Sequence, residues 1–215
     1  MNGKTIAKKL HEIQNCISGA NNHPEIREML LKFGFDQSKI KEGQVKLEKV
    51  NNLMARQVDL YGDQYAATEE TVKNREKAYS EYMILVKVIR VALKDDIDSL
   101  KSFLATGQRS RSLSGWLREA RIAYTNILNS ASAMDRLKIF GITSDKIKDG
   151  LKQVEEIESL YSKQLGKKGD AQQSTIERDQ AFDDLANWYS DFRAIARIAL
   201  YEKPQLLEVL GIVKK

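Results

Sequence analysis

The feature that most constrains this chain is an internal repeat. When the 215-residue sequence is compared with itself at an offset of 107 positions, 22 residue pairs are identical and no gap is needed. This is about one pair in five, whereas average amino-acid usage gives roughly one in sixteen by chance. The identical pairs include Phe33/Phe140, Gly34/Gly141, Gly43/Gly150, Gly62/Gly169, Asp63/Asp170 and Arg90/Arg197. We therefore predict a tandem duplication with two homologous halves, residues 1–107 and 108–215.

The apolar residues of each half are spaced as in amphipathic helices. In the first segment they lie three and four positions apart, at Ile6, Leu10, Ile13, Ile17 and Ala20. The same register returns in the second half at Leu113, Leu117, Ala120, Tyr124 and Ile127. This spacing predicts a helix with one buried face. A short second helix is expected from Pro24, because proline suits a first helical turn. Ala131 replaces this proline in the second half, which favours a first helix that runs on unbroken.

Glycines mark the predicted ends of these helices. Gly34 and Gly141 are each followed by an apolar residue, and Gly211 near the C-terminus shows the same pattern. A glycine just after a helix supplies the left-handed conformation, and the apolar residue after it packs back on the last turn. Asp36 and Thr143 then occupy the N-cap positions of the next helices.

Two long helices are predicted in each half after these caps, with a turn between them. Gly62-Asp63 forms the turn in the first half and Gly169-Asp170 forms it in the second. The segment Met83–Ala92 is apolar around most of its circumference, which predicts a central element. A final short helix is expected over Asp96–Leu104 and over Pro204–Leu210.

The predicted fold class is all-α. With 30% charged residues and only 2 prolines, the composition favours long helices over a turn-rich β fold. We expect a tandem-duplicated helical bundle, with one bundle in each half and a pseudo-twofold relation between the halves. The sequence leaves open whether the halves form two bundles or pool their helices into one.

The chain carries no segment that predicts membrane insertion. Its longest apolar stretch, Tyr82–Val86, is far too short to span a bilayer. The start of the sequence lacks the apolar core of a signal peptide. The single cysteine, Cys16, excludes an intramolecular disulfide, and we expect a cytoplasmic protein.

No catalytic or metal-binding constellation is visible in the sequence. One cysteine and two histidines exclude a Cys/His zinc site. Neither His11 nor His23 follows a glutamate by three positions, which argues against a di-iron site of the bundle type. Cys16 lies on the apolar face of the first helix and is expected to be a small core residue. We therefore predict no cofactor, no metal and no enzymatic activity, although chemistry by carboxylates alone stays open.

The aromatic and basic residues supply the candidate sites. Trp116 and Trp188 stand where the other half has Lys9 and Glu81, which predicts an exposed ring at an interaction surface. The basic cluster near the junction belongs to the same predicted surface and consists of Arg109, Arg111, Arg118 and Arg121. A candidate pocket is predicted around Tyr79, Tyr82, Tyr189, Arg90 and Arg197.

Arg90 and Arg197 recur within the most apolar helices, and such an arginine must pair or reach outward. The repeated glutamates Glu48, Glu155, Glu70 and Glu177 are the predicted partners.

The leading functional hypothesis is a non-enzymatic scaffold or protein-interaction module that binds a protein partner or associates with itself. The alternative is a bundle that binds a small molecule in a pocket between the two halves. Binding of nucleic acid or of an acidic membrane surface ranks third. The excess of five positive charges is spread among abundant acidic residues, so nucleic acid is not an expected partner.

Overall fold

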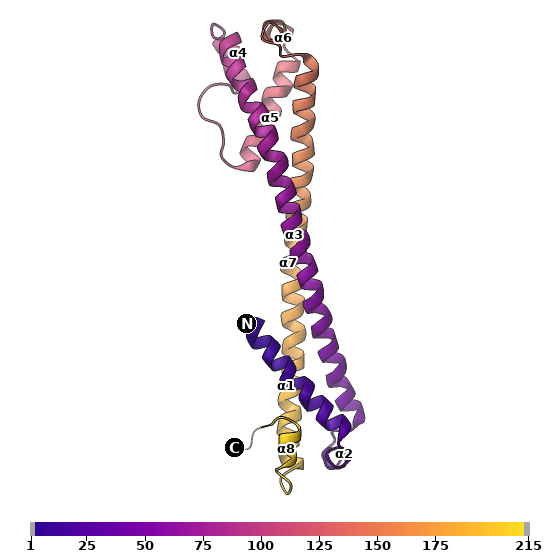
Figure 1. Cartoon of the computed structure of the whole chain (residues 1–215). Helices are drawn as coiled ribbons and strands as arrows, with labels where there is room; N and C mark the ends of the chain where they lie inside the picture. Colours follow the sequence, from indigo (N-terminus) through magenta and orange to yellow (C-terminus); the bar gives the residue numbers. More distant parts are fainter. Residues whose placement is uncertain (1–2, 213–215) are drawn as a thin grey trace. The chain divides into compact units, whose positions relative to one another are not determined.

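The computed structural model describes residues 3–212, and this part of the chain is helical without any strand (Figure 1). Its helices are α1 (Gly3–Asn22), α2 (Pro24–Leu31), α3 (Gln37–Ala92), α4 (Ile97–Ser102), α5 (Leu113–Leu128), α6 (Ala131–Lys138), α7 (Ser144–Ala199) and α8 (Leu206–Val209). The predicted all-α class is confirmed. None of the described helices combines the length and the apolar character needed to cross a lipid bilayer.

The helices form two compact units. Unit 1 comprises residues 1–60 and 170–215, and it contains α1, α2, α8, the N-terminal part of α3 and the C-terminal part of α7. Unit 2 comprises residues 61–169 and contains α4, α5, α6 and the remaining parts of α3 and α7. Each unit therefore draws on both halves of the sequence, and the units do not coincide with the predicted domains 1–107 and 108–215.

The turns predicted at Gly62-Asp63 and Gly169-Asp170 are wrong. Both pairs lie inside 56-residue helices, α3 and α7. Neither glycine has a positive φ. Glycine costs only about 1 kcal/mol relative to alanine inside a helix. Without a proline or a local cap to stop the helix, that cost is too small to break it.

The helix ends follow the predicted local signals. Gly34, Gly141 and Gly211 have φ values of 78°, 73° and 66°, in the left-handed region. The amide of the next residue then bonds back to the helix: Phe35 N to Leu30 O at 3.1 Å, Ile142 N to Leu137 O at 3.2 Å, and Ile212 N to Leu207 O at 2.9 Å. This is the Schellman arrangement, and it satisfies carbonyls that the helix end leaves unpaired.

The predicted N-caps are also present. The amide of Lys39 donates to the Asp36 carboxylate at 2.9 Å, and the amide of Lys146 donates to the Thr143 hydroxyl at 3.3 Å. The unbroken first helix expected for the second half is wrong, because α5 and α6 are separate helices. Ser130 caps α6 by accepting a bond from the amide of Ala133 at 3.3 Å, so a serine begins the helix where the first half uses proline.

Each unit has its own apolar core. In unit 1 the buried face of α1, with Ile6, Ile13 and Ile17, joins Leu185 and Phe192 of α7 in one cluster. In unit 2, Trp116, Tyr124 and Ile127 of α5 join Tyr82 and Ile89 of α3. The apolar faces of α1 and α5 that the sequence predicts thus pack into these two cores.

Candidate binding groove

Both tryptophans are buried, and the predicted exposed ring is wrong. Trp116 is 0% exposed and packs edge-on against Tyr79 and Tyr82, with ring centroids 5.9 and 6.4 Å apart. Its counterpart Lys9 lies with its ammonium 5.6 Å from the centroid of the Phe182 ring. The methylene stem of a lysine can cover the face of a buried aromatic ring while its ammonium stays in water. A lysine at one position of the repeat therefore does not predict exposure of the tryptophan at the other.

Trp188 fills a slot between α3 and α7 in unit 1. Its ring stacks on Phe192 at 5.4 Å and 21°, and its Nε1 donates to the carbonyl of Lys39 at 3.0 Å. The indole lies on Gly43, where an added Cβ would fall 2.1 Å from the Cζ2 atom of the ring. Trp188 is only 6% exposed. A glycine at position 43 is what allows the ring to approach the backbone of α3.

The corresponding place in unit 2 is an open groove of about 370 Å³, hereafter the unit 2 groove. Its apolar lining consists of Ile84, Leu85, Tyr124, Ile142 and Ile147. Its polar lining consists of Glu81, Lys146, Asp149 and Gln153, with Gly150 between them. Position 81 lies 107 residues before Trp188, so a glutamate stands where unit 1 has the indole. The Tyr124 ring covers Gly150, where an added Cβ would lie 2.5 Å from the ring.

The side chains of this groove differ in kind from those at the corresponding place in unit 1. Ile84 is apolar and 60% exposed, whereas its counterpart in the repeat, Asp191, is charged. Gln153 donates to the Glu81 carboxylate at 2.9 Å, and the Lys146 ammonium donates to the carbonyl of Gly141 at 2.9 Å. Within the described residues, no basic side chain lies at ion-pair distance from Glu81 or Asp149. The groove thus combines one exposed isoleucine, Ile84, with two carboxylates that have no ion-pair partner.

The residues of the predicted tyrosine pocket are divided between the two units. Tyr79, Tyr82 and Arg90 belong to unit 2, whereas Tyr189 and Arg197 belong to unit 1. Tyr82 is fully buried, and burial raises the pKa of its phenol, an effect that the nearby Arg109 partly offsets. Tyr82 and Tyr189 belong to the apolar cores of their units, and Tyr79 packs against the core of unit 2.

The predicted ion pair of Arg90 is wrong. Its guanidinium donates to the backbone carbonyls of Ala105 at 2.6 Å and Gly107 at 2.9 Å, and so it holds the segment that follows α4. Arg197 pairs with no carboxylate in the described part of the chain. Arg90 is near the end of α3, where it reaches an irregular segment whose carbonyls have no helical partners.

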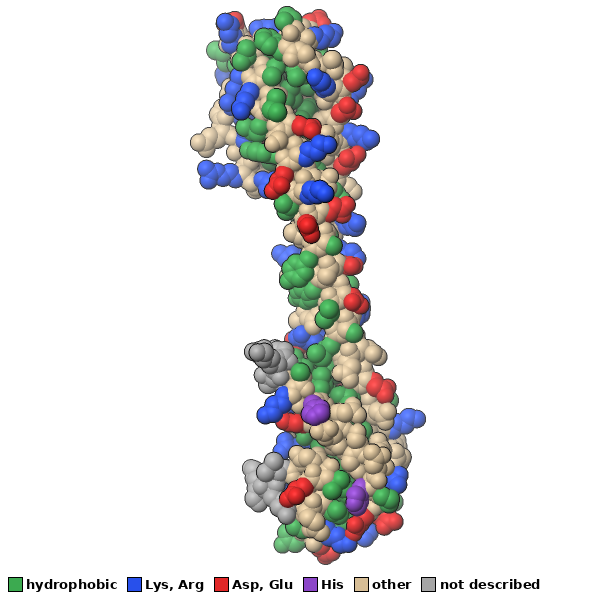
Figure 2. Space-filling view, in the orientation of Figure 1, with side chains coloured by type: hydrophobic (Ala, Val, Ile, Leu, Met, Phe, Trp, Pro, Cys, Tyr) green, Lys and Arg blue, Asp and Glu red, His purple; other side chains and the backbone are tan. Residues whose placement is uncertain are grey.

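The predicted basic cluster is partly neutralised. Arg109 has a side chain only 6% exposed and lies 3.8 Å from Glu119. Arg121 pairs with Glu158 and, at 3.4 Å, with Glu155. Arg111 and Arg118 stay exposed. Basic and acidic side chains are also interspersed on the visible face of each unit (Figure 2).

Cys16 is a core residue, as predicted. It is 0% exposed, and its sulfur lies 2.8 Å from the carbonyl oxygen of Leu210 and 3.7 Å from the Tyr189 hydroxyl. Burial raises the pKa of its thiol to about 11, so the thiolate that nucleophilic chemistry needs is disfavoured. Among the described residues, no group of three or more His, Cys, Asp or Glu side chains is arranged to hold a metal ion.

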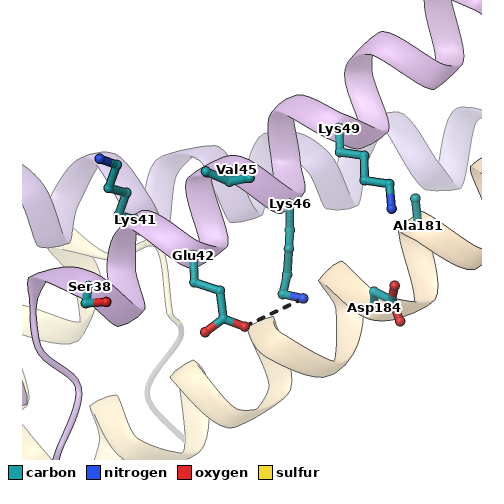
Figure 3. Close-up of a pocket in the computed structure, with 8 residues that line it drawn as sticks. All are labelled: Ser38, Lys41, Glu42, Val45, Lys46, Lys49, Ala181 and Asp184. Atoms are coloured by element: carbon teal, nitrogen blue, oxygen red, sulfur yellow. Dashed lines mark ion pairs between the residues drawn. The ribbon is translucent and has the colours of Figure 1, made fainter.

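A second hollow, of about 540 Å³, lies between α3 and α7 in unit 1 (Figure 3). It is rich in lysine, with Lys41, Lys46 and Lys49 among the residues that line it. Glu42 pairs with Lys46 at 3.6 Å and with Lys39 at 3.0 Å. Asp184 from α7 also lines this hollow. Carboxylates within the hollow therefore offset the positive charge that an anion would require.

Comparisons with protein-family models, with curated proteins and with solved structures gave no significant match.

Proposed function

We propose that this chain is a non-enzymatic protein-interaction module, and that the unit 2 groove binds a segment of a protein partner. We further propose that its two halves arose by tandem duplication. The boundaries of α2 and α6, and those of α3 and α7, differ by 107 residues at both ends, which is the offset of the sequence repeat. Under this proposal the two grooves derive from one ancestral site and have since diverged.

The observation that carries the binding proposal is the contrast between the two corresponding places. In unit 1 the Trp188 ring is hydrogen-bonded to Lys39 and stacked on Phe192, and the hollow beside it, of about 440 Å³, is lined mainly by charged and polar side chains. In unit 2 the Tyr124 ring covers the corresponding glycine, Gly150, Glu81 stands at the repeat position of Trp188, and Ile84 is left 60% exposed at the groove wall. An exposed apolar wall beside oriented polar groups is typical of a recognition site.

A protein segment suits this groove better than a small molecule does. The groove is open to solvent along α3 and α7, whereas sites for small molecules bury most of the ligand surface. A side chain carried by a peptide can enter such a groove while its backbone stays outside. The alternative of a ligand pocket lined by Tyr79, Tyr82 and Tyr189 gains no support within either unit.

A peptide-library selection against the full-length protein tests this proposal. Bound peptides are then measured against three variants of the same chain. Ile84→Asp introduces the charge found at the corresponding place in unit 1, and Glu81→Trp supplies an indole to fill the groove. Asp191→Ala is the matched control in unit 1. We expect selected peptides to bind wild type and Asp191→Ala equally and to lose binding to the two groove variants.

Two results would contradict the proposal. One is a selection that yields no peptide above background. The other is a set of peptides that bind Ile84→Asp and Glu81→Trp as well as they bind the wild type. Far-UV circular dichroism of each variant checks that the helices are intact, which we expect because both substituted positions are exposed.

A further inference from the structure

We propose that the unit 2 groove binds an amphipathic α-helix of a protein partner, with a basic flank turned to α7 and an acidic flank turned to Lys87. This proposal rests on the interaction function proposed above and specifies the conformation and the charge pattern of the partner segment. It follows from an apolar stripe of α3 that extends the groove, from the length of this stripe, and from the charges on its two sides.

The C-terminal part of α3 carries an apolar stripe on its solvent side. Ile84, Val88 and Val91 are spaced by four and three residues, so they lie on one face of the helix. Ile84 and Val91 are 60% and 59% exposed, and Val88 is half-buried. The described part of the chain thus leaves much of this stripe uncovered. A contiguous apolar stripe that faces solvent on a helix is typical of an interaction surface.

The stripe continues along α7, which runs antiparallel to α3 in unit 2. Gln164 of α7 donates to the Thr68 hydroxyl of α3 at 3.1 Å. Further along α3, Glu81 accepts a bond of 2.9 Å from Gln153, which comes earlier in α7. Continuing this register places Val91 level with the beginning of α7.

The dimensions of the extended groove suit a helix. Ile142, just before α7, already lines the groove together with Ile84 and Glu81, so the groove reaches the level of Val91. From Glu81 to Val91 the helix rises by about 15 Å, the length of about three helical turns. A partner helix with apolar residues three and four positions apart can pack them against the same spacing on α3. An extended segment would need a sheet edge to bond its backbone, and the described residues form no strand.

The charges beside the stripe predict the flanks of the partner helix. Glu81 and Lys87 lie three residues before and after Ile84, which places them on opposite sides of the stripe. Glu81 and Asp149 line the side toward α7, and among the described residues neither has an ion-pair partner. Lys87 is exposed, and no carboxylate of the described chain lies at ion-pair distance from it. Lysine or arginine toward α7 and acidic residues toward Lys87 would complement both sides.

The corresponding place in unit 1 lacks this stripe and supplies a control. Its residues are Asp191, Ile195 and Ile198, so a charge interrupts the apolar run. Ile198 is 55% exposed, close to the value for its counterpart Val91. A substitution at Ile198 therefore reproduces the local change made at Val91 but leaves the unit 2 groove intact.

Fluorescence anisotropy with designed peptides tests the helical conformation on the full chain. The mixed probe is a fluorescein-labelled, amidated peptide with two copies of the heptad Glu-Leu-Gln-Ala-Leu-Lys-Ala. Its leucines form one stripe, with glutamates on one side and lysines on the other. The proline probe has proline in place of the alanine that ends the first heptad. We expect saturable binding of the mixed probe and at least tenfold weaker binding of the proline probe, because proline breaks a helix interior.

Two further peptides test the charge pattern. The acidic probe carries glutamate in place of both lysines, and the basic probe carries lysine in place of both glutamates. Each should bind about two- to fivefold more weakly than the mixed probe, the range expected for exposed ion pairs. These differences should shrink as NaCl rises from about 0.05 M to about 0.5 M, because salt screens exposed charges.

Variants of the chain locate the binding site. Ile84→Asp and Val91→Asp should each weaken the mixed probe at least tenfold, whereas Ile198→Asp should leave it unchanged. Lys87→Glu should reverse the preference, so that the basic probe binds better than the mixed probe. Far-UV circular dichroism checks that the helices of each variant are intact.

The proposal is overturned if the proline probe binds as well as the mixed probe, or if both charge probes do. It is also overturned if Val91→Asp binds the mixed probe as Ile198→Asp does, or if no saturable change occurs up to about 1 mM protein. Dimerisation of the chain alone that Val91→Asp abolishes would assign the groove to a second copy and overturn the proposal as well.

These failures differ from failure of the proposed function. Library peptides that need Ile84 but bind Val91→Asp as well as wild type, and that tolerate proline at every position, would overturn this inference and leave the interaction module intact. A library without any groove-dependent peptide would overturn both.

Discussion

Alanine substitutions at two glycines of α3, Gly43 and Gly62, should change the stability of the protein in opposite directions. Both lie in the interior of the same 56-residue helix. An added Cβ at position 62 would meet nothing within 4 Å, whereas at position 43 it would fall 2.1 Å from the Trp188 ring. We expect Gly62→Ala to stabilise the protein and Gly43→Ala to destabilise it.

The expected magnitudes follow from these contacts. Alanine is favoured over glycine inside a helix by about 1 kcal/mol, so Gly62→Ala should raise the free energy of unfolding by about 0.5–1 kcal/mol. The same gain exists at position 43, but there the ring must move by about 1.5 Å to restore ordinary carbon contacts. Overpacking of this kind costs about 1–3 kcal/mol, and loss of the bond from Trp188 to Lys39 costs about 1 kcal/mol more. The net destabilisation by Gly43→Ala should be about 1–3 kcal/mol.

Urea unfolding followed by far-UV circular dichroism measures both changes, and tryptophan fluorescence reports on the packing of Trp188. A turn at Gly62 with positive φ would make Gly62→Ala destabilising, because alanine does not tolerate that conformation. A loss of stability in Gly62→Ala would therefore contradict the continuous helix. A Gly43→Ala variant as stable as Gly62→Ala would show that the indole does not lie on the α3 backbone.

Two further predictions concern titrating groups in the cores. Because burial raises the pKa of the Cys16 thiol to about 11, its alkylation by iodoacetamide at mildly alkaline pH should be about a hundredfold slower in the folded protein than in urea, and equal rates would contradict its burial. Burial also raises the pKa of Tyr124 and Tyr189 well above the ordinary value of 10.0. The fold favours their neutral forms, so this contribution to stability is complete below pH 10 and is lost as the pH rises further. In an alkaline titration followed by far-UV circular dichroism, the Tyr124→Phe variant should withstand a higher pH than wild type, and an equal or lower unfolding pH would contradict the burial of this phenol.

The ends of the helices could be predicted from the sequence because the interactions that form them are local. Gly34 and Gly141 stop their helices through bonds that span only a few residues. Asp36 and Thr143 begin the next helices by accepting bonds from amides three residues ahead. The same rules gave a wrong turn at Gly62, because an isolated glycine is compatible with either a turn or a helix interior.

The candidate groove leaves one signal in the sequence, but the prediction based on this signal is wrong. The mismatch between Trp188 and Glu81 in the repeat predicted an exposed tryptophan as the interaction surface. In the structure Trp188 is buried, and the groove with the apolar lining lies at Glu81 in the other unit. A comparison of two positions shows that they differ, but it does not show which of the two side chains is covered.

The sequence by itself determined the all-α class, the N-caps at Asp36 and Thr143, the glycine helix ends and the apolar faces, since each depends on residues within one or two turns. Only the tertiary structure decided that α3 and α7 are continuous and that each compact unit combines both halves of the chain. It also decided where the groove lies, because burial depends on side chains from a distant segment. Trp188 is buried through contacts with Lys39 and Gly43, about 150 residues away along the chain.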